Sequence, residues 1–140
     1  MPGPTTHILL VEDEDAHAEL MRLSFESRDD IRLTVASTLR EANAHLATAT
    51  PDLTIVDSLL PDGAGLELAR DLCRRSGDPV ILLTSHADEA QEVQALEAGV
   101  WRYLVKSEST LLDIPEIVDE ALRERSRSAS PRLESYDADQ

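Results

Sequence analysis

Lys106 is the only lysine in a chain with thirteen basic residues, and the other twelve are arginine. It follows the apolar run Tyr103-Leu104-Val105, so we expect it at the tip of a buried strand. A lysine ammonium is a compact point charge on a flexible stem, whereas an arginine guanidinium is a planar fork. A lone lysine in an arginine-rich composition therefore indicates a site that needs a point charge.

Three carboxylates and one hydroxyl also stand where apolar runs end. The residues are Glu12, Asp13, Asp57 and Thr84, and the runs before them cover 8–11, 53–56 and 80–83. The carboxyl ends of parallel strands meet at one edge of an open α/β sheet, and ligands bind in the crevice there. We therefore expect the three acids, the hydroxyl and the Lys106 ammonium to converge.

Such an acid cluster predicts a metal site. Two carboxylates about 4 Å apart repel by roughly 4 kcal/mol at an effective dielectric constant of ~20, so the cluster needs a cation or a proton. Mg²⁺ is a hard cation that takes one or two protein carboxylates and accepts phosphate oxygens. Beside a metal, Asp57 suits nucleophilic attack on a phosphoryl group, with Lys106 and Thr84 holding the phosphoryl oxygens.

The elements that must position these groups follow from the hydrophobic pattern. Short apolar runs predict strands at about 7–11, 32–36, 52–57, 79–84 and 102–106. The segments after them carry apolar residues at helical spacing: Ala16, Leu20 and Leu23; Leu39, Ala42 and Leu46; Leu66, Ala69 and Cys73; Val93, Leu96 and Val100; Ile114, Ile117 and Ala121. Five βα units with right-handed crossovers predict a three-layer, doubly wound α/β domain. The expected order of its parallel sheet is the flavodoxin-like 2-1-3-4-5.

Five segments together resemble the receiver domain of two-component response regulators, over roughly residues 5–126. They are Ile8-Leu9-Leu10-Val11-Glu12-Asp13-Glu14; Pro51-Asp52-Leu53-Thr54-Ile55-Val56-Asp57; Leu60-Pro61-Asp62-Gly63 with Gly65-Leu66-Glu67; Pro79-Val80-Ile81-Leu82-Leu83-Thr84-Ser85; and Tyr103-Leu104-Val105-Lys106. The resemblance implies that Asp57 accepts a phosphoryl group from a sensor histidine kinase or a phosphotransfer protein. It also implies that Glu12, Asp13 and Asp57 hold Mg²⁺ together with the backbone carbonyl of Leu59.

The resemblance assigns three further roles. Lys106 would pair with the phosphoryl group, Thr84 would swing toward it, and Tyr103 would be the aromatic switch that turns inward as Thr84 moves. The face made by the fourth helix, the fifth strand and the fifth helix would then change shape and bind a downstream protein target. Such a domain is a signalling module rather than an enzyme, because it catalyses only its own phosphoryl transfer and dephosphorylation.

Ser107 departs from the family pattern, in which a proline in a cis peptide usually follows this lysine. A non-proline cis bond costs about 2.5–4 kcal/mol, so a trans Lys106-Ser107 peptide is the alternative. Ser107 also leaves open a degenerate receiver that binds partners without phosphorylation. A receiver excised from a hybrid kinase is a further alternative. An aspartate-nucleophile phosphohydrolase would typically need a second acid two residues after Asp57, where this chain has Leu59.

Composition sets the remaining expectations. The net charge of −15 argues against a direct nucleic-acid partner. A single cysteine excludes an internal disulfide, and no apolar stretch approaches the ~20 residues that span a bilayer, so we expect a cytoplasmic protein without a membrane partner. The four histidines show no metal-ligand spacing and are expected at the surface or at edges. One receiver domain is expected over 5–126, followed by a polar, disordered tail over 127–140.

Overall fold

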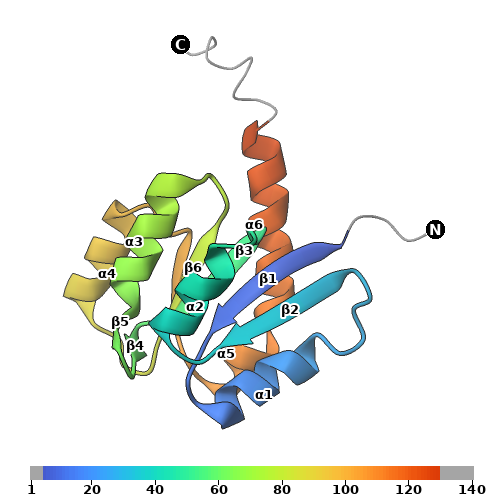
Figure 1. The fold of residues 1–140 in the computed structure, drawn as a ribbon, viewed down its shortest axis with the longest axis horizontal. Coiled ribbons are helices and arrows are strands. Elements are labelled where there is room, and N and C mark those ends of the chain that lie inside the picture. The colour runs from blue at the N-terminus through green and yellow to red at the C-terminus, as the bar shows by residue number, and fades with distance from the viewer. Residues whose placement is uncertain (1–4, 130–140) are drawn as a thin grey trace.

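The computed structural model describes residues 5–129, with side chains through Ser126, and its centre is a five-stranded parallel sheet (Figure 1). The strands are β1 (Thr6–Val11), β2 (Ile31–Ala36), β3 (Leu53–Asp57), β6 (Val80–Thr84) and β7 (Arg102–Val105). Their order across the sheet is β2-β1-β3-β6-β7. These are the five predicted strands in sequence order, so the predicted 2-1-3-4-5 topology is confirmed.

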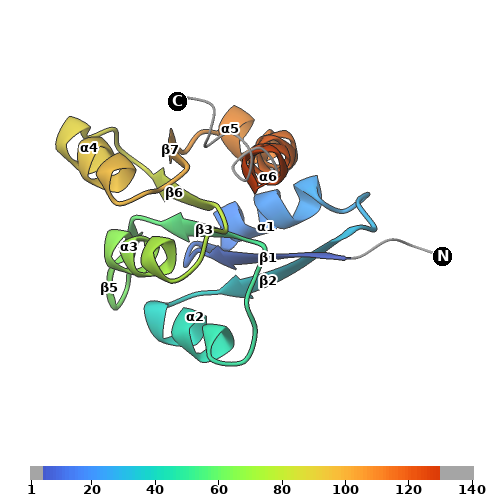
Figure 2. The ribbon, with the colours of Figure 1, turned by 90° about the horizontal axis from the view of Figure 1, so that it is seen from above.

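Helices cover both faces of the sheet (Figure 2). One layer contains α2 (Leu39–Leu46), α3 (Gly65–Arg75) and α4 (Glu89–Glu97), and the other contains α1 (Asp15–Ser24), α5 (Glu108–Leu112) and α6 (Ile114–Ala129). Side chains alternate between the faces of a strand, so β1 sends Leu9 and Val11 to the first layer and Ile8 and Leu10 to the second. The three-layer, doubly wound architecture is therefore confirmed.

A short hairpin follows β3, in a segment where no strand was predicted. Its strands, β4 (Leu59–Leu60) and β5 (Gly63–Ala64), pair antiparallel. At its tip the Asp62 carboxylate accepts hydrogen bonds from the backbone N–H groups of Leu39 (2.8 Å) and Arg40 (3.0 Å). These are otherwise unsatisfied donors at the start of α2, so the hairpin beside Asp57 is tied to the neighbouring helix.

Gly65 begins α3 directly against the end of β3. A Cβ atom at this position would lie 1.9 Å from the backbone oxygen of Asp57 and 2.8 Å from Val56 Cγ1. The Gly65 N–H donates to the carbonyl of Ser58 at 2.9 Å. The absence of a side chain therefore lets α3 approach the strand that carries Asp57.

Of the apolar stripe predicted for the fourth helix, only Val100, which lies just beyond the end of α4, faces the core. Val93 is 53% exposed and Leu96 is 50% exposed, whereas Ala95 is fully buried. The helix lies beside the short edge strand β7, and the small Ala95 side chain allows close approach there. Apolar spacing located this helix correctly but assigned it the wrong buried face.

Two other expectations need correction or qualification. His7 was expected at the surface or at an edge, but it is only 6% exposed, and its Nε2 lies 3.0 Å from Thr34 Oγ1 and 3.2 Å from His45 Nε2.

Helix α6 runs to Ala129, three residues beyond the predicted domain end at 126. The rest of the predicted tail, 130–140, lies outside the described residues. No helix within residues 5–129 is long and apolar enough to cross a membrane.

The Lys106-Ser107 peptide is trans, as are all peptide bonds of the described chain. Ser107 is the N-cap of α5, and its hydroxyl accepts a hydrogen bond from the backbone N–H of Thr110 at 3.1 Å. Serine is among the preferred N-cap residues because its side-chain oxygen can satisfy such a donor. The structure therefore adopts the trans peptide that Ser107, in place of proline, made the alternative.

Candidate functional site

The carboxyl edge of the sheet brings together the groups that the sequence singled out. Glu12 and Asp13 follow β1, Asp57 ends β3, Thr84 ends β6 and Lys106 follows β7. Most of them line an open cleft of about 570 Å³, bordered by Asp13, Glu14, Asp57, Ser58, Leu59, Leu60, Pro61, Thr84, Ser85, His86 and Lys106. The register of parallel strands therefore produces the predicted convergence.

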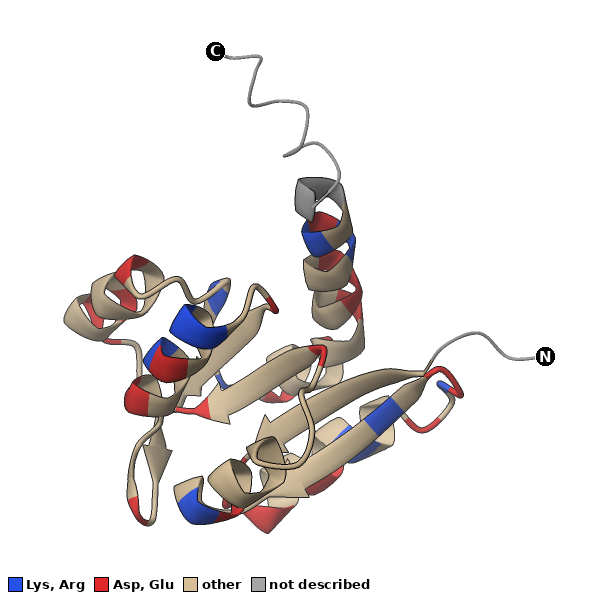
Figure 3. Ribbon diagram, turned by 45° about the horizontal axis from the view of Figure 1, so that its top comes forward, with Lys and Arg blue, Asp and Glu red and all other residues tan. Residues whose placement is uncertain are grey.

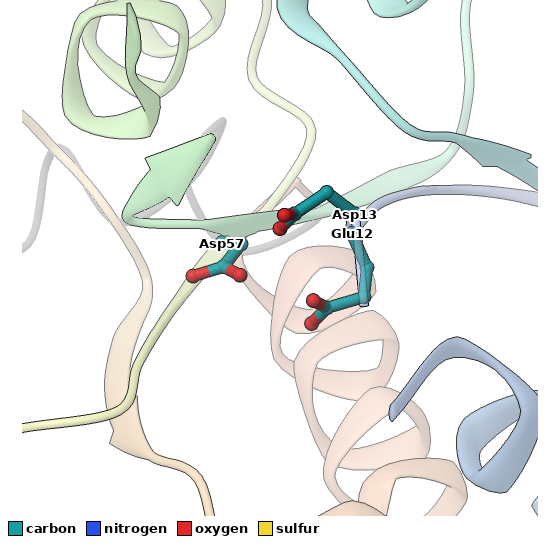
Figure 4. A group of neighbouring side chains, drawn as sticks. All are labelled: Glu12, Asp13 and Asp57. Atoms are coloured by element: carbon teal, nitrogen blue, oxygen red, sulfur yellow. The ribbon is translucent and has the colours of Figure 1, made fainter. Parts of the chain in front are cut away.

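The three carboxylates form a compact cluster (Figure 4). One oxygen from each of Glu12, Asp13 and Asp57 lies within 4.8 Å of the others. Glu12 is 1% exposed and Asp57 is 5% exposed, whereas Asp13 is partly exposed beside the cleft. A set of carboxylate oxygens open to solvent on one side has the donor chemistry of a hard divalent cation, so the residues present fit such an ion.

Lys106 is the cation that holds this cluster together in the structure. Its Nζ lies 2.8 Å from Asp57 Oδ2, 2.9 Å from Glu12 Oε1 and 3.1 Å from His17 Nδ1. Its side chain is 5% exposed. A single buried ammonium thus contacts two carboxyl groups, and a third, that of Asp13, lies within 4.8 Å of both, so the site carries excess negative charge when all three are ionised.

Burial shifts the proton affinities of this group. It raises the pKa of Glu12 to about 7, even though the hydrogen bond from Lys106 and the one from the Glu14 backbone oppose the shift. Burial alone would lower the pKa of Lys106, but its hydrogen bonds to Asp57 and Glu12 outweigh this effect and raise it. Near neutral pH the cluster therefore relieves part of its repulsion by keeping a proton on Glu12.

Thr84 and Tyr103 are linked to other partners. The Thr84 hydroxyl donates to the carbonyl of His86 at 3.1 Å, and the Thr84 carbonyl accepts from the Lys106 N–H at 2.7 Å. The Tyr103 hydroxyl donates to Gln91 Oε1 in α4 at 2.9 Å. The Thr84 hydroxyl is therefore not bonded to the acid cluster, and Tyr103 connects β7 to α4.

Sequence reasoning missed His17, which was expected at the surface or an edge. Its side chain is 30% exposed, and its ring reaches Lys106 from α1. It stands four residues after Asp13, one helical turn into α1, so the spacing alone could have revealed that it faces the same edge. The predicted role of the Leu59 carbonyl as a metal ligand stays a prediction, while the Leu59 N–H donates to Asp57 Oδ1 at 3.3 Å.

Comparison with known protein families gives the class. The family described as "Response regulator receiver domain" matches residues 8–117. This match covers most of the chain and includes the segments that hold the acid cluster, Thr84 and Lys106. The chain therefore belongs to the response regulator receiver domain family.

Curated relatives extend the comparison. The chain is 43% identical over 101 residues to the KDP operon transcriptional regulatory protein KdpE of Escherichia coli, an alignment that covers 72% of this chain and 44% of the relative. It is 38% identical over 131 residues to the methanogenesis regulatory protein FilR1 of Methanothrix harundinacea, covering 88% of this chain and 29% of the relative. The chain spans less than half the length of these relatives.

Solved structures give the same fold. A CheY-like response regulator receiver domain protein from Methanospirillum hungatei has a TM-score of 0.79 at 27% identity, covering 89% of this chain and 98% of the other. The phosphorylated cyanobacterial phytochrome response regulator RcpA has a TM-score of 0.74 at 25% identity, covering 83% and 92%. Receiver domains are signalling modules.

Proposed function

We propose that this chain is a phospho-accepting receiver that takes a phosphoryl group from a sensor histidine kinase, or from a phosphotransfer protein, onto Asp57. The observation that supports this best is the 2.8 Å contact between Asp57 Oδ2 and the chain's only lysine, within a cluster of three acids. The proposed domain covers 5–126 and acts in the cytoplasm through protein contacts. A phosphorylation-independent binding module would not need this complete set of groups.

The proposed transfer uses Asp57 as the nucleophile. A carboxylate oxygen of Asp57 forms the bond to phosphorus as the bond from phosphorus to the imidazole nitrogen of the donor breaks. Lys106 then exchanges its hydrogen bond to Asp57 for one to a phosphoryl oxygen, because its ammonium is already within 2.8 Å of the acceptor. Thr84 rotates its hydroxyl from the His86 carbonyl toward the same group.

Glu12, Asp13, Asp57 and the Leu59 carbonyl would hold Mg²⁺. When bound, the ion would neutralise the carboxylates and the charge that spreads over the phosphoryl oxygens during transfer. Binding of Mg²⁺ would release a proton from Glu12, since a carboxyl group with a pKa of about 7 is partly protonated at neutral pH. Asp57 remains accessible from the cleft for the donor imidazole.

The signal would leave through the face made by α4, β7 and α6. Val93 and Leu96 of α4 and Val105 of β7 are 53%, 50% and 41% exposed, so this face offers apolar side chains to a downstream protein. Acidic residues and no basic ones surround them on α4 (Figure 3). Tyr103 bonds to Gln91 in the same helix, so a turn of its ring would alter the face. The acidic composition argues against direct nucleic-acid contact by this domain.

The decisive experiment is phosphorylation by acetyl phosphate with Mg²⁺. The wild type should be labelled at Asp57, and Asp57→Asn and EDTA-treated protein should stay unlabelled. Asp62→Asn is the matched control, because Asp62 lies in the adjacent hairpin and caps α2 without belonging to the acid cluster. Equal labelling of Asp57→Asn and wild type would refute the assignment of the acceptor.

A second variant tests the role of the lone lysine. Lys106→Arg should not support phosphorylation-dependent target binding, because a planar guanidinium cannot occupy a pocket in which three acceptors surround one nitrogen. Binding of the phosphorylated variant to the partner kinase or target would be compared with wild type by titration. Undiminished binding would show that any cation suffices.

A further inference from the structure

The Lys106 ammonium has three acceptors, and one of them belongs to none of the proposed chemical steps. The ammonium carries three N–H donors; its Nζ is in hydrogen-bond contact with Asp57 Oδ2 at 2.8 Å and His17 Nδ1 at 3.1 Å, and it forms an ion pair with Glu12 Oε1 at 2.9 Å. His17 comes from α1, whereas Lys106 follows β7, so the contact joins a helix that covers the sheet to the end of its edge strand. His17 therefore completes the hydrogen bonding of a cation that is almost fully buried.

The direction of this hydrogen bond follows from the chemistry of the two groups. An ammonium has no lone pair and can only donate, so His17 Nδ1 must accept, and the proton of the neutral ring stands on Nε2. The carboxylates of Glu14 and Glu12 lie farther from Nδ1, at 3.4 and 3.9 Å. The shortest contact of Nδ1 is thus with Lys106, and a donor N–H at this atom would point at the ammonium.

We infer that His17 is a positioning residue for Lys106. The inference rests on the proposed function in one respect, because it assumes that a phosphoryl oxygen replaces Asp57 Oδ2 as a hydrogen-bond partner of Lys106. Two of the three acceptors, Glu12 and His17, do not react. They can hold Lys106 Nζ beside Asp57 while the ammonium transfers its remaining hydrogen bond from Asp57 Oδ2 to the phosphoryl oxygen. A cation that is already in place needs no reordering during transfer.

Substitution at position 17 separates an acceptor role from a packing role. His17→Leu keeps bulk but removes the acceptor, His17→Ala removes both, and His17→Asn keeps an amide oxygen at about the place of Nδ1. Because a hydrogen bond to a charged group is among the stronger ones, we expect the initial rate of Asp57 labelling by acetyl phosphate with Mg²⁺ to fall roughly 5- to 10-fold in the Leu and Ala variants. The Asn variant should regain most of the rate.

The single lysine offers a readout that does not depend on activity. Protein labelled with ¹⁵Nζ-lysine has one side-chain ammonium resonance, from Lys106. In the metal-free wild type its protons should exchange slowly with water, because three acceptors and burial protect them. We expect faster exchange and a shifted resonance in His17→Leu and His17→Ala, and recovery in His17→Asn. His45→Leu, at the opposite end of the sheet, is the matched control and should change neither the resonance nor the labelling rate.

The outcomes are separable from those of the proposed function. Wild-type labelling rate and resonance in both His17→Leu and His17→Ala would overturn the inference while leaving Asp57 as the acceptor. A His17→Asn variant as defective as His17→Leu would show that the imidazole acts by shape rather than as an acceptor, which also overturns it. Absence of labelling in the wild type would refute the proposed function, and the resonance would still test whether His17 holds Lys106.

Discussion

The two ends of the sheet carry the same kinds of charge in different surroundings. At the amino edge, Arg125 of α6 lies 2.7 Å from Asp78 and 4.0 Å from Asp52, and these side chains are 28–39% exposed. At the carboxyl edge, Lys106 lies 2.8 Å from Asp57 and 2.9 Å from Glu12, and these side chains are at most 6% exposed. The shortest distances at the two edges are similar, but the amino-edge side chains are far more exposed to water.

This difference separates structural charge from functional charge. Water shares the solvation of the amino-edge pairs, and pairs of that kind contribute about 0–1 kcal/mol to folding. The carboxyl edge excludes water from one ammonium and two acids and places a third acid within 4.8 Å. Burial of excess charge costs free energy unless a ligand neutralises it, so this edge is suited to bind a cation and then a phosphoryl group.

Removal of the cation at each edge should give the largest contrast. We expect Lys106→Met to lower the free energy of unfolding of the metal-free protein by about 3 kcal/mol above neutral pH, because it leaves buried carboxylates without a partner. Arg125→Met should cost about 1 kcal/mol or less. Urea unfolding of both variants measures the difference. Equal losses at the two edges would mean that burial does not distinguish them.

Glu12→Gln should stabilise the metal-free protein in a pH-dependent way. Burial raises the pKa of Glu12 to about 7, so its contribution to stability is present below its unfolded pKa near 4.5 and is lost as the pH rises through 7. Glutamine resembles the protonated form at every pH. The gain should therefore be near zero in acid and about 3 kcal/mol above pH ~8. A gain that does not change with pH would contradict the shifted pKa.

Mg²⁺ should stabilise only a protein with an intact carboxyl edge. At a concentration about ten times its dissociation constant, a ligand of the folded state adds about 1.4 kcal/mol. We expect this gain in the wild type and in Arg125→Met, and its loss in Asp13→Asn, which removes the most exposed acid of the cluster. Thermal unfolding with Mg²⁺ and with EDTA gives the comparison. The same gain in Asp13→Asn would place the ion elsewhere.

The smallest effect is expected at the amino edge, at His7. Burial, then Arg32 and His45, lower the pKa of His7, while Asp52 opposes them. The unfolded chain therefore binds more protons than the folded one just below pH ~6.5, and the stability that His7 contributes is lost as the pH falls. Arg32→Gln should raise the pKa of His7 and reduce this loss, which NMR titration of the ring would detect. An unchanged titration would show that burial and His45, rather than Arg32, lower the pKa of His7.

The site could be predicted because its residues stand at, or directly after, the ends of predicted strands. Asp57 and Thr84 follow predominantly apolar runs, and parallel strands must bring such positions to one edge. His7 could not be predicted in this way, because its partners Thr34 and His45 are 27 and 38 residues away in sequence. The buried face of α4 was also beyond the pattern. Val93 and Leu96 have core-like spacing, yet Ala95 makes the contact at the edge of the sheet.

The close approach at Gly65 bears on how mutations in this domain would be interpreted. A methyl group there would overlap the backbone oxygen of Asp57, so every single-nucleotide change that adds a side chain displaces the acceptor strand. A saturation mutagenesis screen scored by signalling output would rank Gly65 beside Asp57 in intolerance, although Gly65 contributes no reactive atom. Such a score does not distinguish a position where a side chain would clash from a position that takes part in the reaction. Mutational intolerance alone would therefore wrongly suggest that Gly65 is a reactive residue.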